Sequence, residues 1–157
     1  MIEQQVGELM ERQGLTLATA ESSTGGLVAN RITNAPGSSA YYLGGFVAYA
    51  NEAKEALLGV RRETLVSFGA VSEQTAREMA RGARRSIGAD VAISVTGIAG
   101  PGGGTSVKPV GLAYVALSAA DADLCERHVW QGDRLANKEQ TADAALRLLV
   151  TYLQDSR

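Results

Sequence analysis

The chain has a single cysteine and a single histidine, and this scarcity limits the chemistry open to it. Cys125 alone cannot form an internal disulfide, a paired-cysteine redox motif or a thiolate zinc site. Because no cluster of acids and histidines compensates, we expect no metal and no other cofactor. His128 lies in an alternating segment typical of an edge strand, so it is badly placed to serve as the base of a serine triad.

Long apolar runs and an excess of basic charge are also missing. No run approaches the ~20 residues that a membrane-spanning helix needs, and Glu3 stands where a signal peptide would carry basic residues. The formal net charge is -2 and the basic residues are scattered, which offers nucleic acid no binding surface. We therefore expect a soluble, cytoplasmic protein that binds neither membranes nor nucleic acids.

The hydrophobic content of 45% in 157 residues is enough for one compact domain, residues 1–157. Short apolar segments of strand length alternate with amphipathic helical patterns, and they cover residues 16–20, 44–49, 90–96 and 110–117. Residues 124–130 predict an additional antiparallel edge strand. Because helices must cover both faces of such apolar strands, the pattern predicts a three-layer α/β/α sandwich with a mixed sheet. The exposed edge and small size also favour self-association into a homo-oligomer.

Three polar residues stand where helices are expected to begin. Asn51 is predicted to cap a short helix over 52–58, Ser72 a longer one that reaches Ile87, and Asp133 the last helix. Lys138 falls on the polar side of that last helix, where we expect its side chain to be exposed to solvent.

A serine stands where the first strand is expected to turn into a helix, in the segment Ala20-Glu21-Ser22-Ser23-Thr24-Gly25-Gly26. The amides of such a turn point at whatever lies beyond the strand end, and the two glycines allow a close approach of the backbone. This favours Ser22 as a nucleophile beside an oxyanion site. By pattern alone, a capped helix start built from small residues is the commoner explanation.

A serine nucleophile needs a base, and lysine can serve if burial lowers its pKa. Apart from Lys138, the only lysines are Lys54 and Lys108, and both flank strand ends. Lys54 has Tyr49 nearby as a second group able to handle protons. The sequence pattern leaves open which of the two lysines is the base.

The glycine-rich segment 97–105 is predicted to be a loop between strands. Its amides could wrap a phosphate or a ribose, although such loops are as often plain connectors. It lacks the Gly-Lys-Ser/Thr ending of a P-loop and does not run from strand to helix with Rossmann spacing, so neither motif applies.

Several segments in the same order resemble the CinA C-terminal domain family: AESSTGG at 20–26, GGFVAYANEAKEALLGV at 44–60, GAVSEQTAREMARGA at 69–83, SVTGIAGPGGGT at 94–105 and KPVG at 108–111. The resemblance covers nearly the whole chain. It implies a nicotinamide-nucleotide amidohydrolase, which converts nicotinamide mononucleotide (NMN) to nicotinate mononucleotide and ammonia in pyridine-nucleotide salvage. It also implies the stand-alone form, without the molybdopterin-binding-like domain that some relatives carry at the N-terminus.

The resemblance assigns roles to individual positions. The family serine falls on Ser22, the tyrosine at the strand end on Tyr49 and the lysine of the next helix on Lys54. The substrate-binding positions fall on Ser23, Thr24, Gly25, Gly26, Thr96, Gly97, Ala99, Gly100 and Lys108. Ser23 departs from the family pattern, because many relatives carry cysteine there. A thiol at that place cannot therefore be the nucleophile in this chain, and two neighbouring hydroxyls, those of Ser22 and Ser23, are left to distinguish.

The resulting hypothesis is acyl transfer from the NMN carboxamide to Ser22, with Lys54 and Tyr49 managing the protons and amides around Thr24 to Gly26 holding the oxyanion. Two alternatives remain. One is a nucleotide-sensing or partner-binding module that keeps the pocket without catalysis. The other is an enzyme that acts on a different carboxamide or a related pyridine nucleotide.

Overall fold

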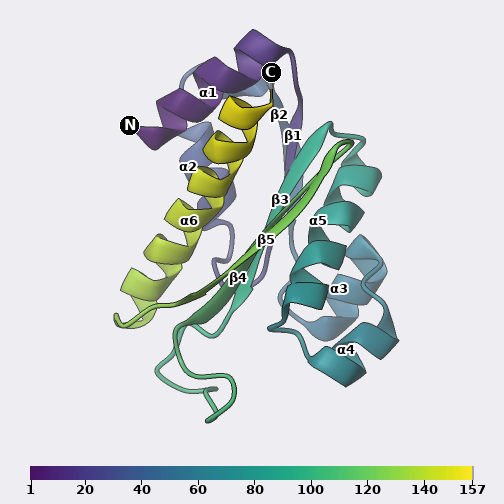
Figure 1. The fold of residues 1–157 in the computed structure, drawn as a ribbon, viewed down its shortest axis with the longest axis vertical. Coiled ribbons are helices and arrows are strands. Elements are labelled where there is room, and N and C mark those ends of the chain that lie inside the picture. The colour runs from purple at the N-terminus through teal and green to yellow at the C-terminus, as the bar shows by residue number, and fades with distance from the viewer. Residues whose placement is uncertain (157) are drawn as a thin grey trace.

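The computed structural model describes residues 1–156 and confirms the α/β sandwich with a mixed sheet (Figure 1). Five strands form one sheet in the order β2-β1-β3-β4-β5. They are β1 (Leu17–Glu21), β2 (Tyr42–Val47), β3 (Val91–Gly97), β4 (Leu112–Ala119) and β5 (Ala122–Val129). Strand β1 runs parallel to β2 and β3, whereas β3–β4 and β4–β5 are antiparallel pairs. The edge strand expected near 124–130 is thus present as β5.

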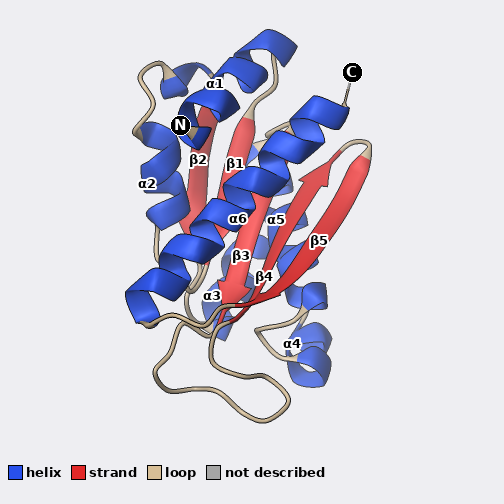
Figure 2. Cartoon of the chain, turned by 60° about the vertical axis from the view of Figure 1, so that its left-hand side comes forward, coloured by secondary structure: helices blue, strands red, loops and turns tan. Residues whose placement is uncertain are grey.

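Helices cover both faces of the sheet (Figure 2). One layer holds α1 (Ile2–Gln13), α2 (Leu27–Thr33) and α6 (Arg134–Asp155); the other holds α3 (Asn51–Leu58), α4 (Arg62–Phe68) and α5 (Glu73–Ile87). A 3-10 turn, η1 (Ser38–Ala40), precedes β2. Within residues 1–156, no helix is both long enough and apolar enough to cross a membrane.

Alternation along the strands builds a separate core on each face of the sheet. Large side chains such as Leu17, Ile93 and Leu117 pack toward α1, α2 and α6. Their neighbours Ala18 and Ala92 face the α5 layer. The small residues on that side let α5 approach the sheet closely. Sheets of this kind bind ligands beyond the carboxyl ends of their parallel strands, which here include β1 and β3.

The capping predictions were right for two helices and wrong for one. Ser72 accepts a hydrogen bond from the Thr75 amide, and Asp133 accepts one from the Ala136 amide. At the third helix the cap is Ala50, whose backbone is extended, and Asn51 is already the first helical residue. The predicted strand limits were displaced by one or two residues, and α4 was not predicted at all. That helix is short and buries only Thr64 and Leu65, so it leaves a weak periodic signal.

Candidate functional site

Ser22 lies at the carboxyl end of β1, held between two neighbouring strands. Its amide donates to the Val95 carbonyl of β3 at 3.1 Å, and the Glu21 carbonyl accepts from the Ala48 amide at 2.8 Å. These bonds continue the sheet pairing one residue past the strand end. The main chain that carries the Ser22 hydroxyl is therefore fixed, and the side chain is only 8% exposed.

Lys54 brings its amine to that hydroxyl from the first turn of α3. Its Nζ donates to Ser22 Oγ at 3.1 Å and to the Tyr49 carbonyl at 2.9 Å. The side chain is 1% exposed, and within residues 1–156 it has no acidic partner. Burial lowers the pKa of Lys54 below its ordinary value, because desolvation disfavours the ammonium form. The structure thus pairs a hydroxyl with an amine that is easier to deprotonate than an exposed lysine.

Lys108, the other lysine considered for this role, is placed differently. Its Nζ donates to the Phe68 carbonyl at the end of α4, and its amide donates to Thr105 Oγ1 at 2.9 Å. Lys108 therefore connects the glycine-rich loop to α4, whereas Lys54 touches the serine. These contacts distinguish the two lysines, which the sequence pattern could not do: Lys54 Nζ contacts Ser22, and Lys108 Nζ contacts Phe68.

Tyr49 offers its main chain, not its ring, to Lys54. The side chain is 62% exposed, and its hydroxyl accepts a hydrogen bond from Arg134 at 3.4 Å. No contact joins that hydroxyl to Ser22 or to Lys54 in the described chain. The expected lysine–tyrosine pair is therefore a contact through the Tyr49 carbonyl, and the phenol faces outward at the start of α6.

The turn after Ser22 is held by a buried carboxylate, that of Glu21, to which the sequence reasoning gave no role. Its Oε1 accepts from Thr24 Oγ1 at 2.5 Å, from the Gly26 amide at 3.2 Å and from the Val28 amide at 2.9 Å, while Oε2 accepts from the Ala29 amide at 3.0 Å. Glu21 is 1% exposed. It caps α2 from five residues before the cap position, Gly26. Its place between a strand and a glycine pair is the one sequence signal that could have revealed it.

The turn leaves other amides free than the ones expected to hold an oxyanion. The Gly25 amide already donates to the Ser22 carbonyl at 3.1 Å, and the Gly26 amide donates to Glu21. Among residues 1–156, the amides of Ser23 and Thr24 have no acceptor. The two glycines serve instead through their backbone, with φ of 60° at Gly25 and 103° at Gly26.

The glycine-rich loop after β3 is fixed at its beginning by α6. Asn137 donates to the Ala99 carbonyl at 3.0 Å, and Arg134 donates to the Gly100 carbonyl at 2.7 Å. Figure 2 shows the start of α6 and this loop at the end of the sheet where β3 terminates. Arg134 also donates to the Tyr49 hydroxyl, so it connects Gly100 with Tyr49. Sequence reasoning missed Arg134 and Asn137 because nothing in a helical pattern marks them.

Two other expected positions have structural partners. Thr96 is 1% exposed, and its hydroxyl donates to the Ala70 carbonyl at 2.9 Å. At Gly97 an added Cβ would lie 2.8 Å from the Leu112 carbonyl oxygen, so packing alone explains that glycine. Lys138, expected to be exposed, is half-buried and turned toward Gly25.

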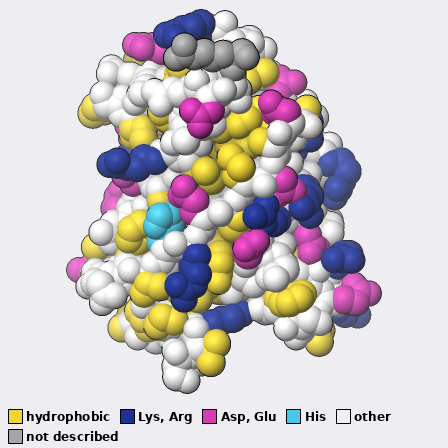
Figure 3. Space-filling model, viewed as in Figure 1, with side chains coloured by type: hydrophobic (Ala, Val, Ile, Leu, Met, Phe, Trp, Pro, Cys, Tyr) yellow, Lys and Arg dark blue, Asp and Glu magenta, His cyan; other side chains and the backbone are white. Residues whose placement is uncertain are grey.

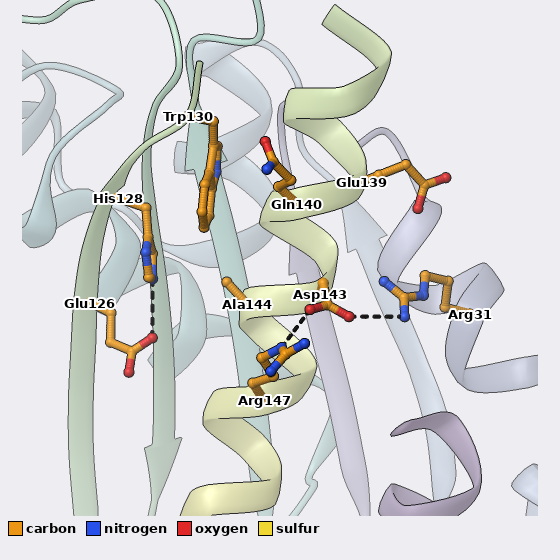
Figure 4. A pocket seen from close by; sticks show the side chains of 9 residues that line it. All are labelled: Arg31, Glu126, His128, Trp130, Glu139, Gln140, Asp143, Ala144 and Arg147. Carbon is orange, nitrogen blue, oxygen red and sulfur yellow. Dashed lines mark hydrogen bonds and ion pairs between the residues drawn. The ribbon is translucent and has the colours of Figure 1, made fainter. Parts of the chain in front are cut away.

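His128 belongs to a different part of the molecule. A hollow of about 830 Å³ between β5 and α6 is lined by Arg31, Glu126, His128, Trp130, Glu139, Gln140, Asp143, Ala144 and Arg147 (Figure 4). His128 stacks on Trp130 with ring centroids 4.6 Å apart and contacts Glu126. Strand spacings of about 4.8 Å put β5 about 14 Å from β1, so His128 cannot be the base for Ser22. Around this hollow, acidic and basic side chains are interspersed, without an expanse of one sign (Figure 3).

Among residues 1–156, no group of three or more histidine, cysteine, aspartate or glutamate side chains is placed to hold a metal ion. The chemistry that the residues around Ser22 offer is nucleophilic. A fixed hydroxyl faces a desolvated amine, two unpaired amides follow it, and a buried carboxylate holds the turn.

Comparison with known proteins relates the sequence and the fold of this chain to one family. Residues 1–153 match the model of the CinA C-terminal domain. A "CinA-like protein" of Chloroherpeton thalassium is 54% identical over 99% of this chain, and this chain spans 38% of that protein's length. A crystal structure of a CinA superfamily protein from Klebsiella pneumoniae superposes with a TM-score of 0.94 at 34% identity, covering 98% of this chain and 96% of that one. The competence/damage inducible protein CihA from Agrobacterium tumefaciens gives 0.89 at 43% identity, covering 98% and 95%. The chain belongs to the CinA C-terminal domain family.

Proposed function

We propose that this chain is an amidohydrolase that removes ammonia from the carboxamide of NMN, with Ser22 as nucleophile and Lys54 as base. The observation that carries the proposal is the contact between Lys54 Nζ and Ser22 Oγ at 3.1 Å, made by a buried amine without an acidic partner. A neutral amine at this distance can take the proton of the hydroxyl as it attacks. The choice of NMN as the substrate rests on the resemblance to the CinA C-terminal domain family.

The reaction would proceed through an acyl-enzyme. Ser22 Oγ attacks the carboxamide carbon while its proton passes to Lys54 Nζ. The oxyanion that forms would be held by the amides of Ser23 and Thr24, which have no acceptor within residues 1–156. Lys54 then gives the proton to the departing nitrogen, and ammonia leaves.

Water completes the turnover. It attacks the ester carbon while Lys54 takes its proton, and Ser22 Oγ leaves with that proton restored. Nicotinate mononucleotide is released. Tyr49, whose hydroxyl contacts Arg134, would contact the substrate from the outer side of the site and not exchange protons with Lys54 directly. Ala99 and Gly100, whose carbonyls are fixed by α6, would line the same side.

Ammonia release from NMN by the purified chain is the direct test. We expect Ser22→Ala to abolish release and Lys54→Met to lower turnover by about 10²- to 10⁴-fold, the usual contribution of a positioned base. Undiminished release by Ser22→Ala would remove Ser22 from the mechanism. Full activity of Lys54→Met together with inactivity of Lys108→Met would mean that the base is Lys108. Thermal stabilisation by NMN without any ammonia would indicate a binding module instead.

A further inference from the structure

The ammonium of Lys138 lies beside the serine turn and has no acidic partner in the described chain. Lys138 stands in the second turn of α6 and is half-buried. A Cβ built on Gly25 would lie 3.8 Å from its Nζ. Among residues 1–156, this Nζ makes no ion pair or hydrogen bond. An ammonium that has lost part of its hydration without gaining a counterion favours an anionic ligand.

The neighbouring charges on α6 strengthen this reading. Arg134 lies four residues earlier, so it is a neighbour of Lys138 on the helix surface. It also reaches the site, through Gly100 and Tyr49. The nearby acids of α6 face elsewhere: Glu139 and Asp143 line the hollow beside β5, and Figure 4 shows Asp143 between Arg31 and Arg147. Arg134 and Lys138 therefore put positive charge on the side of α6 near the serine turn, whereas Glu139 and Asp143 lie at the hollow beside β5.

We propose that Lys138 binds the phosphate of a mononucleotide whose carboxamide lies at Ser22, and so sets the preference for phosphorylated over unphosphorylated substrates. This rests on the proposed function. A lysine suits the task because its compact charge on a flexible stem can follow a phosphate without a fixed fork geometry. Lys138 comes from α6, whereas the reacting groups come from the β1–α2 turn and α3. We therefore expect Lys138 to affect KM, through substrate binding, and not kcat.

Kinetics with two substrates test the proposal. Lys138→Met should raise KM for NMN about 10- to 100-fold, the range expected when a hydrogen bond between charged groups is lost, and leave kcat within about twofold. Its kcat/KM for nicotinamide riboside, which lacks the phosphate, should not change. Lys138→Arg should restore most of the NMN affinity, and Arg12→Met, an exposed cation on α1, is the matched control. Equal losses for NMN and the riboside, or no loss for either, would overturn the proposal.

A binding measurement separates this proposal from the proposed function. In the Ser22→Ala background NMN is not consumed, so calorimetry reports its affinity directly. Adding Lys138→Met should weaken NMN binding by the same about 10- to 100-fold. If the unmodified chain released no ammonia, the proposed function would fail and this comparison alone would decide the role of Lys138. Equal NMN affinity with and without Lys138→Met, or no NMN binding to either chain, would refute it.

Discussion

Replacing Glu21 by glutamine should lower the free energy of unfolding by about 2 to 3 kcal/mol, although the two side chains have nearly the same shape. The carboxylate accepts four hydrogen bonds, three through Oε1 and one through Oε2 from the Ala29 amide. The glutamine carbonyl can replace Oε1. The glutamine NH₂ cannot replace Oε2, because it is a donor and would face the Ala29 amide.

The magnitude follows from these contacts. An unsatisfied buried amide costs about 1–3 kcal/mol. The three bonds that remain change from charged to neutral, which weakens each by up to about 1 kcal/mol. Relief of the desolvation of a carboxylate that is 1% exposed offsets part of this loss. The net decrease in the free energy of unfolding is therefore about 2 to 3 kcal/mol.

Urea denaturation measures the change, with Glu63→Gln as control because Glu63 is exposed in the first turn of α4 and accepts no side-chain bond of this kind. The activity of Glu21→Gln should also fall, since the carboxylate fixes the turn that carries Ser22. A loss below about 0.5 kcal/mol, the usual range for surface substitutions, would show that the four bonds do not hold the turn as argued.

Three other changes test separate parts of the structure. Tyr41→Phe should keep or raise stability by up to about 1 kcal/mol, because the Tyr41 hydroxyl is buried without a partner among residues 1–156; a loss above about 1 kcal/mol in urea would contradict this. Gly82→Ala should lower the free energy of unfolding by about 2 kcal/mol or more, although alanine has the better helix propensity. The reason is that the new Cβ would lie 1.8 Å from the Leu58 carbonyl oxygen. A higher Tm for this variant would disprove the close packing. Burial lowers the pKa of Lys54 from its ordinary value of 10.5. Between the lowered pKa and 10.5, the folded chain therefore binds fewer protons at Lys54 than the unfolded chain does. The free energy of unfolding should rise with pH over that range. Lys54→Met should lack this rise in urea titrations at successive pH values, and an identical pH profile would count against a shifted lysine.

Local pattern was enough to predict the sandwich and the position of Ser22 at the end of a strand. The inner strands β1, β3 and β4 are buried on both faces and the helices are amphipathic, so covering both faces of the sheet with helices is the arrangement the pattern favours. Ser22 could be placed at a strand end because it directly follows β1, whereas Lys54 was one of two candidate lysines until the resemblance and the hydrogen bonds distinguished it from Lys108. The contact between Ser22 and Lys54 spans only one neighbouring strand and the turn after it.

What could not be predicted depends on side-chain direction and on packing between distant segments. The Tyr49 ring turns outward while its carbonyl turns inward, and no periodicity encodes that difference. Arg134, Asn137 and Lys138 reach the site only because α6 packs across the sheet more than a hundred residues after Ser22. The sequence of α6 predicted only an amphipathic helix packed on the sheet, so Lys138, on its polar side, was expected to be exposed.

The glycine-rich loop has a root held by α6 and an exposed tip around Gly102. Ala99 and Gly100 are tied to the first turns of α6, whereas residues 101–107 are all exposed, and an added Cβ at Gly102 would meet no atom within 4 Å. Extra residues inserted beside Gly102 would extend outward and leave the root in place. The chain can therefore change the length and chemistry of this tip at little cost to the framework below.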